Sequence, residues 1–248
     1  MDKVLLVTGG GRGIGAATAH LAAQAGWAVA VNYTANSLAA DEVVRHIRAE
    51  GGQAMSVRAD VADEPQVKAM FERIDAKFGR LTGLVNNAGV VDVSARIDEM
   101  DMARWRRMFD INVLGSFLCA REAVRRMSTR HGGEGGAIVN VSSAAARLGA
   151  PGQYVDYAAA KAAIDAFTIG LAKEVGGEGI RVNAVRPGLI ETDIHASGGL
   201  PDRVRDLQHQ VPMGRGGRAD EVAQAIAWLL SDAASYTTMA LLDVSGGR

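Results

Sequence analysis

Tyr157 and Lys161 lie four residues apart in the stretch YVDYAAAK, and they are the clearest candidates for chemistry in this sequence. The residues around them are typical of a helix, on which positions four apart share a face. At about 5 Å and an effective dielectric constant of about 20, the ammonium group favours a phenolate by roughly 3 kcal/mol. We therefore predict that Lys161 lowers the pKa of Tyr157 from about 10 toward about 8, which suits a general acid or base acting on a carbonyl or an alcohol.

Tyr154 stands seven residues before the same lysine. On a helix that spacing corresponds to about 10 Å along the axis, so the ammonium group acts on it much less. We expect Tyr154 to line the substrate pocket or to pack, and Tyr157 to do the chemistry.

Two serines, Ser142 and Ser143, end the apolar run GGAIVNVSS, which is typical of a buried strand. A hydroxyl group at the end of such a strand can donate a hydrogen bond to a substrate oxygen and orient it against the tyrosine. Ser143, fourteen residues before Tyr157, is the predicted catalytic serine, and Ser142 is the alternative. Capping of the strand end is the structural role open to both.

The glycine-rich loop TGGGRGIG, residues 8–15, follows the apolar run KVLLV and precedes the helical stretch IGAATAHLAAQAG. Glycines let a backbone approach a pyrophosphate closely, and a helix N-terminus supplies N–H donors and a favourable dipole. The glycines are spaced as Gly9-x-x-x-Gly13-x-Gly15 rather than as G-x-G-x-x-G. Because the loop lies between a strand and a helix, we predict that it binds a dinucleotide.

The end of the next predicted strand, WAVAVNY, indicates which dinucleotide is preferred. An acidic residue there would bind the ribose hydroxyls of NAD and repel a 2′-phosphate, but Asn32 and Tyr33 occupy these positions. Arg12 in the glycine loop offers a planar set of donors to a phosphate. We predict that NADP(H) is preferred over NAD(H); the alternative for Arg12 is a solvated loop cation.

Strand-like and helix-like stretches alternate along the whole chain, which predicts repeated βαβ units. The predicted fold is a single Rossmann-like, doubly wound α/β domain spanning residues 1–248, with a parallel sheet of about seven strands and helices on both faces. Residues 101–127 are expected to form one long helix. The least regular piece, residues 189–217, follows the sixth predicted strand and is the predicted substrate-binding segment. It offers Ile194, His195, Leu200 and Met213 without a diagnostic charge pattern. We expect His195 to be a lid or surface residue rather than a base.

Composition argues against several other classes of function. The net charge is −1, from 27 basic and 28 acidic residues with no charged block, which gives no indication of nucleic-acid or membrane binding. No apolar run approaches the roughly 20 residues of a membrane helix. The single cysteine, Cys119, lies among apolar residues and is expected in the core, and a lone cysteine favours a reducing, cytoplasmic setting. The five histidines lack metal-ligand spacing, so no metal site is predicted.

The glycine loop and the later Tyr-x-x-x-Lys pair together resemble the short-chain dehydrogenase/reductase family, whose loop reads T-G-x-x-x-G-x-G. The resemblance extends over the whole chain and implies the roles of further residues. NNAG, residues 86–89, matches a motif that holds the central sheet and borders the cofactor. Asn112 matches an asparagine that binds a water in a proton relay to the lysine, although a buried structural role is the alternative. Lys161 is implied to hold the ribose hydroxyls as well.

The resemblance also implies which residues contact the cofactor. The stretch RPGLIET matches a segment that meets the nicotinamide amide, and Asp60 and Val61 match positions near the adenine. One departure is Met239, where family members commonly carry glycine. Members are often tetramers, so a homo-oligomer, tetramer or dimer, is implied. The predicted cofactor-binding residues are Gly9, Arg12, Gly13, Ile14, Gly15, Asn32, Tyr33, Asp60, Val61, Asn87, Ala88, Gly89, Tyr157, Lys161, Pro187, Gly188, Ile190 and Thr192.

The predicted function is hydride transfer between a nicotinamide and a carbonyl or secondary alcohol, with Tyr157, Lys161, Ser143 and Asn112 as the catalytic set. Two alternatives stay open at this point: a dinucleotide-binding sensor or scaffold without turnover, and a methyltransferase, which would also use a glycine-rich loop. The methyltransferase usually keeps an acidic residue at the end of the second strand and has no need of the tyrosine–lysine pair. Ketones, aldehydes, sugars, acyl thioesters and steroids are all possible substrates.

Overall fold

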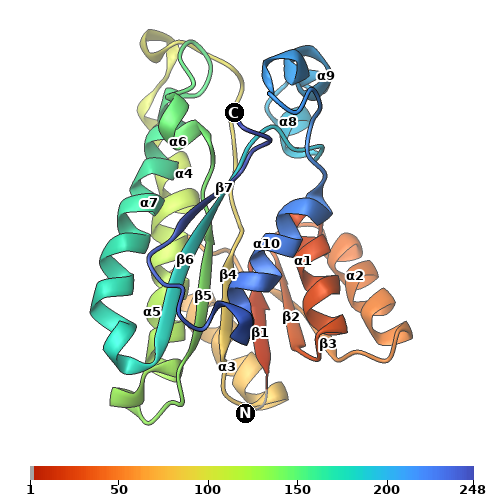
Figure 1. Cartoon of the computed structure of the whole chain (residues 1–248), viewed down its shortest axis with the longest axis vertical. Helices are drawn as coiled ribbons and strands as arrows, with labels where there is room; N and C mark the ends of the chain where they lie inside the picture. Colours follow the sequence, from red (N-terminus) through yellow and green to blue (C-terminus); the bar gives the residue numbers. More distant parts are fainter. Residues whose placement is uncertain (1–2) are drawn as a thin grey trace.

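The computed structural model describes residues 3–248, except for the side chain of His195. Its centre is one seven-stranded sheet in the order β3-β2-β1-β4-β5-β6-β7, with every pair of neighbours parallel (Figure 1). The strand order reverses between β1 and β4, and a crevice at such a point is where doubly wound folds bind ligands. The predicted fold class is confirmed. The strands are β1 Val4–Val7, β2 Ala28–Tyr33, β3 Ala54–Arg58, β4 Gly83–Asn86, β5 Gly136–Val141, β6 Ile180–Pro187 and β7 Leu241–Val244.

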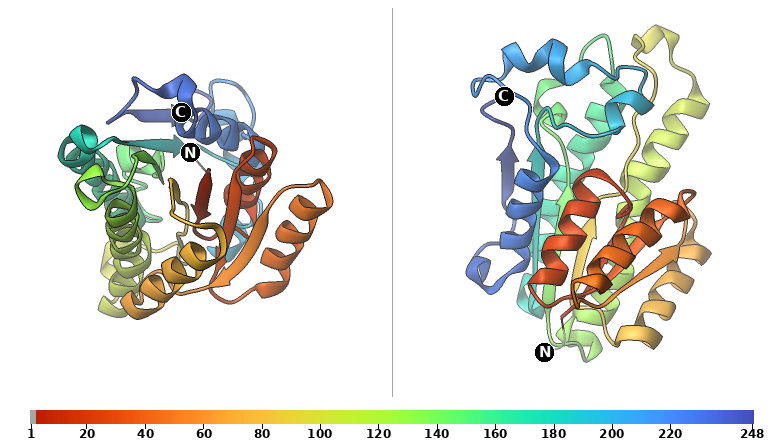
Figure 2. Two further views of the ribbon diagram at one scale, coloured as in Figure 1. Left: turned by 90° about the horizontal axis from the view of Figure 1, so that it is seen from below. Right: turned by 90° about the vertical axis from the view of Figure 1, so that its right-hand side faces the viewer.

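Helices cover both faces of the sheet (Figures 1 and 2). The layer on one face contains α1 (Gly13–Gln24), α2 (Ser37–Ala49) and α10 (Ala219–Leu230), and the layer on the other contains α3 (Glu64–Phe78), α5 (Gly115–Met127) and α7 (Val155–Val175). Each layer buries its own apolar cluster against the strands, and Cys119 lies fully buried in one of them, as expected. Short 3₁₀ turns cover Ile97–Glu99, Thr129–His131, Gly176–Glu178, Gln208–Gln210 and Asp232–Ala234.

Local signals in the sequence explain where several helices begin. The side chains of Asn36, Asp63 and Asp101 each accept a hydrogen bond from the backbone N–H three residues ahead, at the starts of α2, α3 and α4 (Met102–Phe109). These side chains satisfy amide groups that a helix leaves without partners at its first turn. Pro65, in the first turn of α3, costs nothing there because its position needs no donor.

The expected long helix over residues 101–127 contains a turn of a different kind. A π-helical turn, Asp110–Leu114, separates α4 from α5, and Asn112 lies within it. Such turns insert one residue into a helix and are frequent at functional sites, but the residue pattern on either side is that of an ordinary helix. The helical stretch is therefore continuous from Met102 to Met127, as predicted, but its middle turn is π-helical.

A buried chain of side-chain amides and hydroxyls ties α7 to the centre of the sheet. Asn86 Nδ2 on β4 donates to Asn140 Oδ1 on β5 at 2.9 Å, and Asn140 Nδ2 donates to Thr168 Oγ1 on α7 at 2.9 Å. The Thr168 hydroxyl group in turn donates to the carbonyl oxygen of Ile164. Buried polar groups that are paired in this way specify one arrangement of the elements that carry them. The helix with Tyr157 and Lys161 is thus held in register with the strand ends.

Met239 has a positive φ of 65°, in the left-handed region that favours glycine. Its backbone N–H donates to the carbonyl oxygen of Val182 at 2.7 Å, which leads the chain into β7. A non-glycine residue pays about 1–2 kcal/mol in this conformation. This geometry gives a physical reason for the glycine that the related pattern carries at this position.

Two further findings concern the described residues as a set. No helix among them is long and apolar enough to cross a membrane. Across residues 3–248, leaving aside His195, no group of three or more histidine, cysteine, aspartate or glutamate side chains is arranged to hold a metal ion.

Candidate active site

The helix α7 places Tyr157 and Lys161 on one face, with Lys161 Nζ 5.5 Å from the centroid of the tyrosine ring. The lysine is only 4% exposed, and its ammonium group donates to the carbonyl oxygen of Val141 at the end of β5, 2.8 Å away. Burial lowers the pKa of Lys161 to about 8, because the charged form loses its hydration. Asp165, one turn further on, acts in the opposite direction. The lysine is therefore a cation that can give up its proton near neutral pH.

The predicted lowering of the Tyr157 pKa by Lys161 does not appear in the protein by itself. Burial raises the pKa of Tyr157 to about 12, and a hydrogen bond with Ser143 and the charge of Arg203 offset only part of that effect. The sequence argument counted the charge of the lysine but not the loss of water around the phenol, which only the packed structure reveals. This part of the prediction was wrong for the chain alone.

The two adjacent serines have different surroundings. The hydroxyl group of Ser142 is buried and donates to the backbone oxygen of Lys161 at 3.1 Å, which anchors β5 to α7. The hydroxyl group of Ser143 is partly exposed, hydrogen-bonds Tyr157 and accepts the N–H of Ala145 at 3.1 Å. The structure therefore brings Ser143, the serine preferred from the sequence, to the tyrosine.

Asn112 lies fully buried beside Lys161. Its amide nitrogen donates to the carbonyl oxygens of Val90 and Met108, and its Oδ1 accepts the N–H of Val90 at 3.2 Å. Gly89 separates the two: a Cβ atom there would lie 2.7 Å from Asn112 Oδ1 and 3.4 Å from Lys161 Nζ. The amide side chain thus has a structural role, and the structure places it next to Lys161.

The glycine loop lies at the carboxyl end of β1 and leads directly into α1. Gly9 and Gly13 have φ values of 60° and 54°, and a Cβ atom on the buried Gly15 would lie 2.5 Å from Asn87 Nδ2. The helix starts at Gly13 with no side-chain cap on Arg12 and no acidic residue in its first turn. Its first amide groups are therefore open to an anion, and the loop has the bare backbone that a pyrophosphate needs. The residues present fit a dinucleotide.

The NNAG stretch holds this loop in place. The Thr8 hydroxyl group accepts the backbone N–H groups of Asn87 and Ala88 at 2.9 and 3.0 Å, and Asn87 Nδ2 donates to the carbonyl oxygens of Thr8 and Gly9. These bonds join the ends of β1 and β4, the two strands at the reversal of strand order. The motif acts here as a rigid support for the loop.

Arg12 and Asn32, the two residues used to choose between dinucleotides, differ in their contacts. Arg12 is exposed and makes no ion pair with any residue in the described part of the chain. Asn32 is buried: its Oδ1 accepts the N–H of Gly9, and its Nδ2 donates to Ala59 O at 3.0 Å. The Asn32 side chain fastens the glycine loop to the end of β3, a structural role that sequence reasoning missed. Tyr33, next to it, is partly exposed.

The remaining predicted cofactor residues lie at the same end of the sheet. Asp60 Oδ1 accepts the N–H of Ala62 in the turn after β3, and Val61 is buried against Gly115. Gly188 follows β6 so closely that a Cβ atom there would lie 2.7 Å from Ser245 Cα. Thr192 approaches the loop, since a Cβ atom on Gly13 would lie 3.3 Å from its methyl group. Ile14 packs against the core at the start of α1, and Pro187 and Ile190 are buried at and after the end of β6.

The segment 189–217 contributes α8 (Ile194–Ser197) and α9 (Arg203–Leu207), which lie beyond the carboxyl ends of the strands, at the same end of the molecule as α6 (Ala145–Leu148; Figure 1). Tyr154 is buried beneath it and its hydroxyl group donates to Gly198 O at 3.4 Å. Arg203 stacks over the Tyr154 ring, with Cζ 5.1 Å from the centroid. Sequence reasoning missed Arg203, because a lone arginine in an irregular segment gives no signal. His195 lies outside the described side chains.

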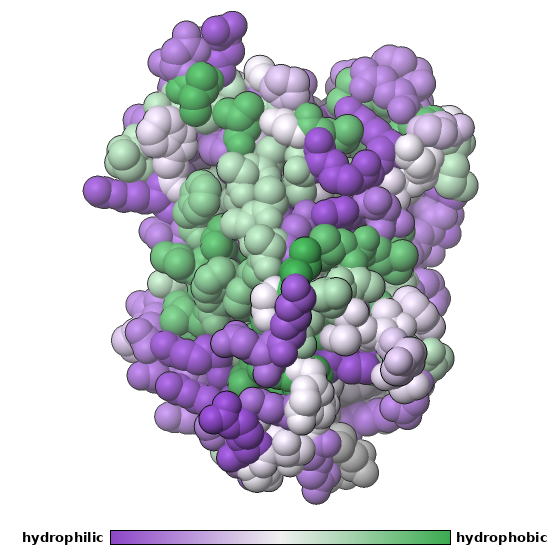
Figure 3. All heavy atoms as spheres, turned by 60° about the vertical axis from the view of Figure 1, so that its left-hand side comes forward, coloured by the Kyte–Doolittle hydropathy of each residue, from purple (hydrophilic) through white to green (hydrophobic). Residues whose placement is uncertain are grey.

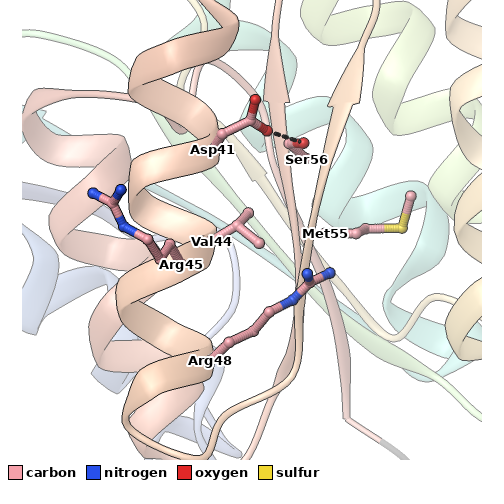
Figure 4. A pocket seen from close by; sticks show the side chains of 6 residues that line it. All are labelled: Asp41, Val44, Arg45, Arg48, Met55 and Ser56. Atoms are coloured by element: carbon pink, nitrogen blue, oxygen red, sulfur yellow. Dashed lines mark hydrogen bonds between the residues drawn. The ribbon is translucent and has the colours of Figure 1, made fainter.

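Two surface cavities in the described part of the chain are lined by residues other than the predicted catalytic set, although Ile190 and Met213 border the second of them. One, of about 430 Å³, lies between α2 and β3 and is lined by Asp41, Val44, Arg45, Arg48, Met55 and Ser56 (Figure 4). Its polar groups pair with the protein: Ser56 donates to Asp41 at 2.6 Å, and Arg48 donates to Ala54 O. The other, of about 760 Å³, lies between residues 212–217 and the tail after β7, where Arg215 and Glu221 form an ion pair. Neither brings the predicted catalytic residues together.

The comparisons with known proteins agree with this geometry. The family model described as "Enoyl-(Acyl carrier protein) reductase" matches residues 9–248. The chain is 56% identical to an uncharacterized oxidoreductase of Escherichia coli K12, covering 99% of both chains. It is 46% identical to a cis-4-hydroxycyclohexanecarboxylate dehydrogenase of Sinomonas cyclohexanicum (99% and 96% covered) and 40% identical to a 3-oxoacyl-[acyl-carrier-protein] reductase of Synechocystis (99% and 96%). A solved Serratia marcescens short-chain dehydrogenase/reductase variant superposes with a TM-score of 0.91 at 33% identity, covering 99% and 97%.

Proposed function

This chain belongs to the short-chain dehydrogenase/reductase family of NAD(P)-dependent oxidoreductases, and we propose that it transfers a hydride between NADP(H) and a carbonyl or secondary alcohol. The observation that carries the proposal is the meeting of Tyr157, Ser143 and the buried Lys161 at one end of the sheet, beside the glycine loop. A dinucleotide sensor would need the loop but not this set.

The catalytic roles follow from the donors and acceptors that surround the substrate oxygen. When bound, the nicotinamide supplies or accepts the hydride. In the direction of reduction, Tyr157 donates its proton to the carbonyl oxygen, and Ser143 donates a second hydrogen bond that holds this oxygen in place. In the direction of oxidation, the tyrosine takes the proton from the alcohol. The side chains of Tyr157 and Ser143 are both partly exposed, whereas Ser142 is buried and its hydroxyl group is bonded to Lys161 O.

Lys161 and Asn112 are proposed to help Tyr157 gain and lose its proton. A tyrosine with a pKa of about 12 is a poor base near neutral pH, so oxidation requires extra positive charge next to it. Lys161, with its pKa lowered to about 8, can carry a proton toward or away from the site, and we propose that it also holds the ribose hydroxyls. Asn112, packed against Gly89 beside the ammonium group, connects that lysine to the loop after β4.

The preference for NADP(H) rests on Arg12. Its guanidinium group is exposed at the N-terminus of α1 and lacks a carboxylate partner in the described part of the chain, so it is free to meet a 2′-phosphate. The end of β2 offers no carboxylate to the ribose hydroxyls, because Asn32 is engaged inside the fold. We propose that residues 1–248 act as one dinucleotide-binding and catalytic domain, and that residues 189–217 grip the substrate.

The substrate is proposed to be a small molecule with a ketone or secondary alcohol. Two relatives are named for different compounds, a hydroxylated ring acid and a 3-oxoacyl thioester, and both contain this reacting group. We place the reaction in the cytoplasm, in keeping with the buried, unpaired Cys119.

A homo-oligomer, tetramer or dimer, is part of the proposal. Hydrophobic side chains gather on the face that carries α5 and α7 (Figure 3). On it Phe117 is 40% exposed and stacks on Phe167 with the ring centroids 3.9 Å apart, and Leu114 is 49% exposed. A contiguous apolar patch of this kind marks an interaction surface, and the family resemblance points to a second copy of the chain.

The test is oxidation of NADPH and NADH over a panel of ketones and aldehydes, with Tyr157→Phe beside the wild type. We expect turnover by the wild type and a loss of about 10³-fold or more in the variant, with NADPH affinity retained, because only the proton donor is removed. Equal rates in the two proteins would remove Tyr157 from the mechanism. Tight NADPH binding with no turnover of any carbonyl would favour the sensor.

A further inference from the structure

Arg203 is a half-buried cation at the edge of the proposed active site. It projects from α9, the short helix of the segment 189–217, and lies over the face of Tyr154. One of its N–H groups donates to Gln153 Oε1 at 2.6 Å. Together with a side-chain hydrogen bond to Tyr154, these contacts hold the guanidinium group in one orientation, because the aromatic ring and the amide oxygen fix its plane.

No carboxylate in the described part of the chain forms an ion pair with Arg203. The neighbouring acids are engaged elsewhere: Asp202 pairs with Arg205 at 3.0 Å, and Asp206 also contacts Arg205. The charged and titratable groups that act on Arg203 are Tyr154, Tyr157 and the cation Arg248. Desolvation and the like charge of Arg248 both destabilise the charged form of Arg203. A charge that is partly removed from water normally has a partner, so a half-buried guanidinium group without a carboxylate partner points to an anion that comes from outside.

The position of Arg203 near Tyr157 indicates that the anion it lacks is part of the substrate. The guanidinium charge acts on Tyr157, the proposed proton donor, as well as on Tyr154. Tyr154, whose ring Arg203 covers, lies at the start of α7, three residues before Tyr157, so a substrate whose oxygen meets Tyr157 and Ser143 can extend toward Arg203. By contrast, Arg205, on the same short helix, is 68% exposed in its side chain and already paired with two aspartates.

We propose that Arg203 binds a carboxylate group of the substrate, so that this enzyme acts on oxo acids and their hydroxy-acid counterparts. This inference rests on the proposed function and names the substrate class of the same site. A guanidinium group presents two parallel N–H donors that match a carboxylate, and such charge-assisted pairs are strong where water is excluded. Arg203 is then a specificity-determining residue, whereas Tyr157 does the chemistry.

A carboxylate fits this position better than an acyl thioester does. The group next to the reacting carbonyl of a 3-oxoacyl thioester is a neutral thioester, which gives a guanidinium group no charge to neutralise. A cation without an anion would then stay buried against a neutral ligand, at a cost in desolvation. A preference for 3-oxoacyl thioesters over oxo acids is therefore a result that the experiment below can detect.

The experiment uses oxo acids paired with their neutral carboxamides: pyruvate, levulinate and 4-oxocyclohexanecarboxylate, each against its amide. We measure kcat and KM with NADPH for the wild type, Arg203→Met, Arg203→Lys and the control Arg205→Met. We expect the wild type to prefer at least one acid over its amide by about tenfold or more. Arg203→Met should lower kcat/KM for that acid by about 10- to 100-fold, mainly through KM, and leave the amide within about threefold. Arg203→Lys should restore part of the loss, and Arg205→Met, which removes an exposed side chain paired with aspartates, should show no loss that is specific to acids.

Binding of a non-reactive anion separates this inference from the proposed function. Calorimetry of the NADPH-loaded protein with cyclohexanecarboxylate should show binding that Arg203→Met weakens by about tenfold or more and Arg205→Met does not. If the enzyme reduces amides or 3-oxoacyl thioesters but prefers no acid, the proposed role of Arg203 is overturned. The proposed hydride-transfer function would then still stand. Equal losses on acids and amides in Arg203→Met would also overturn it, because the residue would then act through the fold or Tyr157. If cyclohexanecarboxylate binds in an Arg203-dependent way but no substrate is turned over, the carboxylate site is supported and the proposed function is contradicted.

Discussion

The glycine loop and the segment 189–217 lie at the same end of the sheet but are held in place very differently. Polar side chains around the loop are engaged inside the protein: Thr8, Asn32 and Asn87 each bond to the backbone of a neighbouring element. In the segment, Arg203 faces the site without a carboxylate partner in the described part of the chain. The comparison indicates that the proposed cofactor side presents rigid backbone, and that the proposed substrate side presents side-chain charge. The first suits a ligand shared by a whole family, and the second a ligand that differs between members.

The adjacent serines test whether inward-bonded side chains support the fold while side chains at the site act on the substrate. Ser142 is bonded inside the protein, and Ser143 contacts Tyr157. We expect Ser143→Ala to lower kcat by about 10²- to 10³-fold with little change in stability, because it removes a donor to the reacting oxygen. Ser142→Ala should keep most of the activity and lower the free energy of unfolding by about 1–3 kcal/mol, because it removes a buried hydrogen bond to Lys161 O. Steady-state kinetics and urea denaturation of both variants provide the measurement. Reversed effects would mean that Ser142 is the catalytic serine.

A methyl group inside the glycine loop tests whether the cofactor side is as rigid as its bonds suggest. In Gly15→Ala the new Cβ atom would lie 2.5 Å from Asn87 Nδ2 and 2.7 Å from Gly9 O, and the second of these neighbours is backbone. We expect NADPH affinity to fall by about 30- to 100-fold, measured by fluorescence titration, because the loop must shift away from α1. Gly170→Ala, on α7 with no atom within 4 Å of the new carbon, is the matched control. It should bind NADPH normally and gain up to about 1 kcal/mol in stability. Unchanged affinity in Gly15→Ala would show a pliable loop.

Charge at the entrance of the loop tests the cofactor preference. We expect Arg12→Ala to lower kcat/KM for NADPH by about 10- to 30-fold and to leave that for NADH within about threefold, because only the first carries the 2′-phosphate. Arg58 is another exposed arginine, but its Nε donates to the carbonyl oxygen of Thr34, so Arg58→Ala serves as the comparison variant. If Arg12→Ala lowers kcat/KM equally for NADPH and NADH, the arginine supports the loop and does not bind the 2′-phosphate.

The pH dependence of stability tests the burial of Lys161. Its pKa falls from the ordinary 10.5 to about 8 on folding, so between these values the unfolded chain holds more protons than the folded one. Stability from this group therefore rises with pH, by roughly 2 kcal/mol between about pH 8 and 10. We therefore compare the unfolding free energies of the wild type and Lys161→Met without added NADPH. From about pH 8 to 10, the wild type should gain roughly 2 kcal/mol relative to the variant. A constant difference would mean that the lysine is not desolvated. Above pH 10 the raised pKa of Tyr157 acts in the opposite direction, because the unfolded chain then loses its tyrosine proton first.

Several features follow from sequence alone because their causes are local. The alternation of apolar strands and amphipathic helices predicts a parallel sheet with two covered faces, and the seven strands agree with it. The spacing of Tyr157 and Lys161 on a helix places both on one face. The glycine loop lies between its strand and its helix as the motif requires, with Gly9 and Gly13 in the left-handed region.

The features that the sequence could not supply depend on what surrounds a residue in space. The pKa of Tyr157 rises because neighbours far apart in the chain remove its water, and Asn32 becomes a structural amide because β3 ends beside it. The π-helical turn at Asn112 forms where α4, α5 and α7 meet, although the residues themselves suit a continuous helix. The role proposed for Arg203 depends on the placement of α9 over Tyr154 and on the pairing of the neighbouring acids Asp202 and Asp206 with Arg205. Motifs and periodicity therefore determine the fold and the cofactor side, since these rest on short-range geometry. Tertiary structure decides burial, charge pairing and the substrate side, since desolvation and Coulomb interactions depend on three-dimensional neighbours.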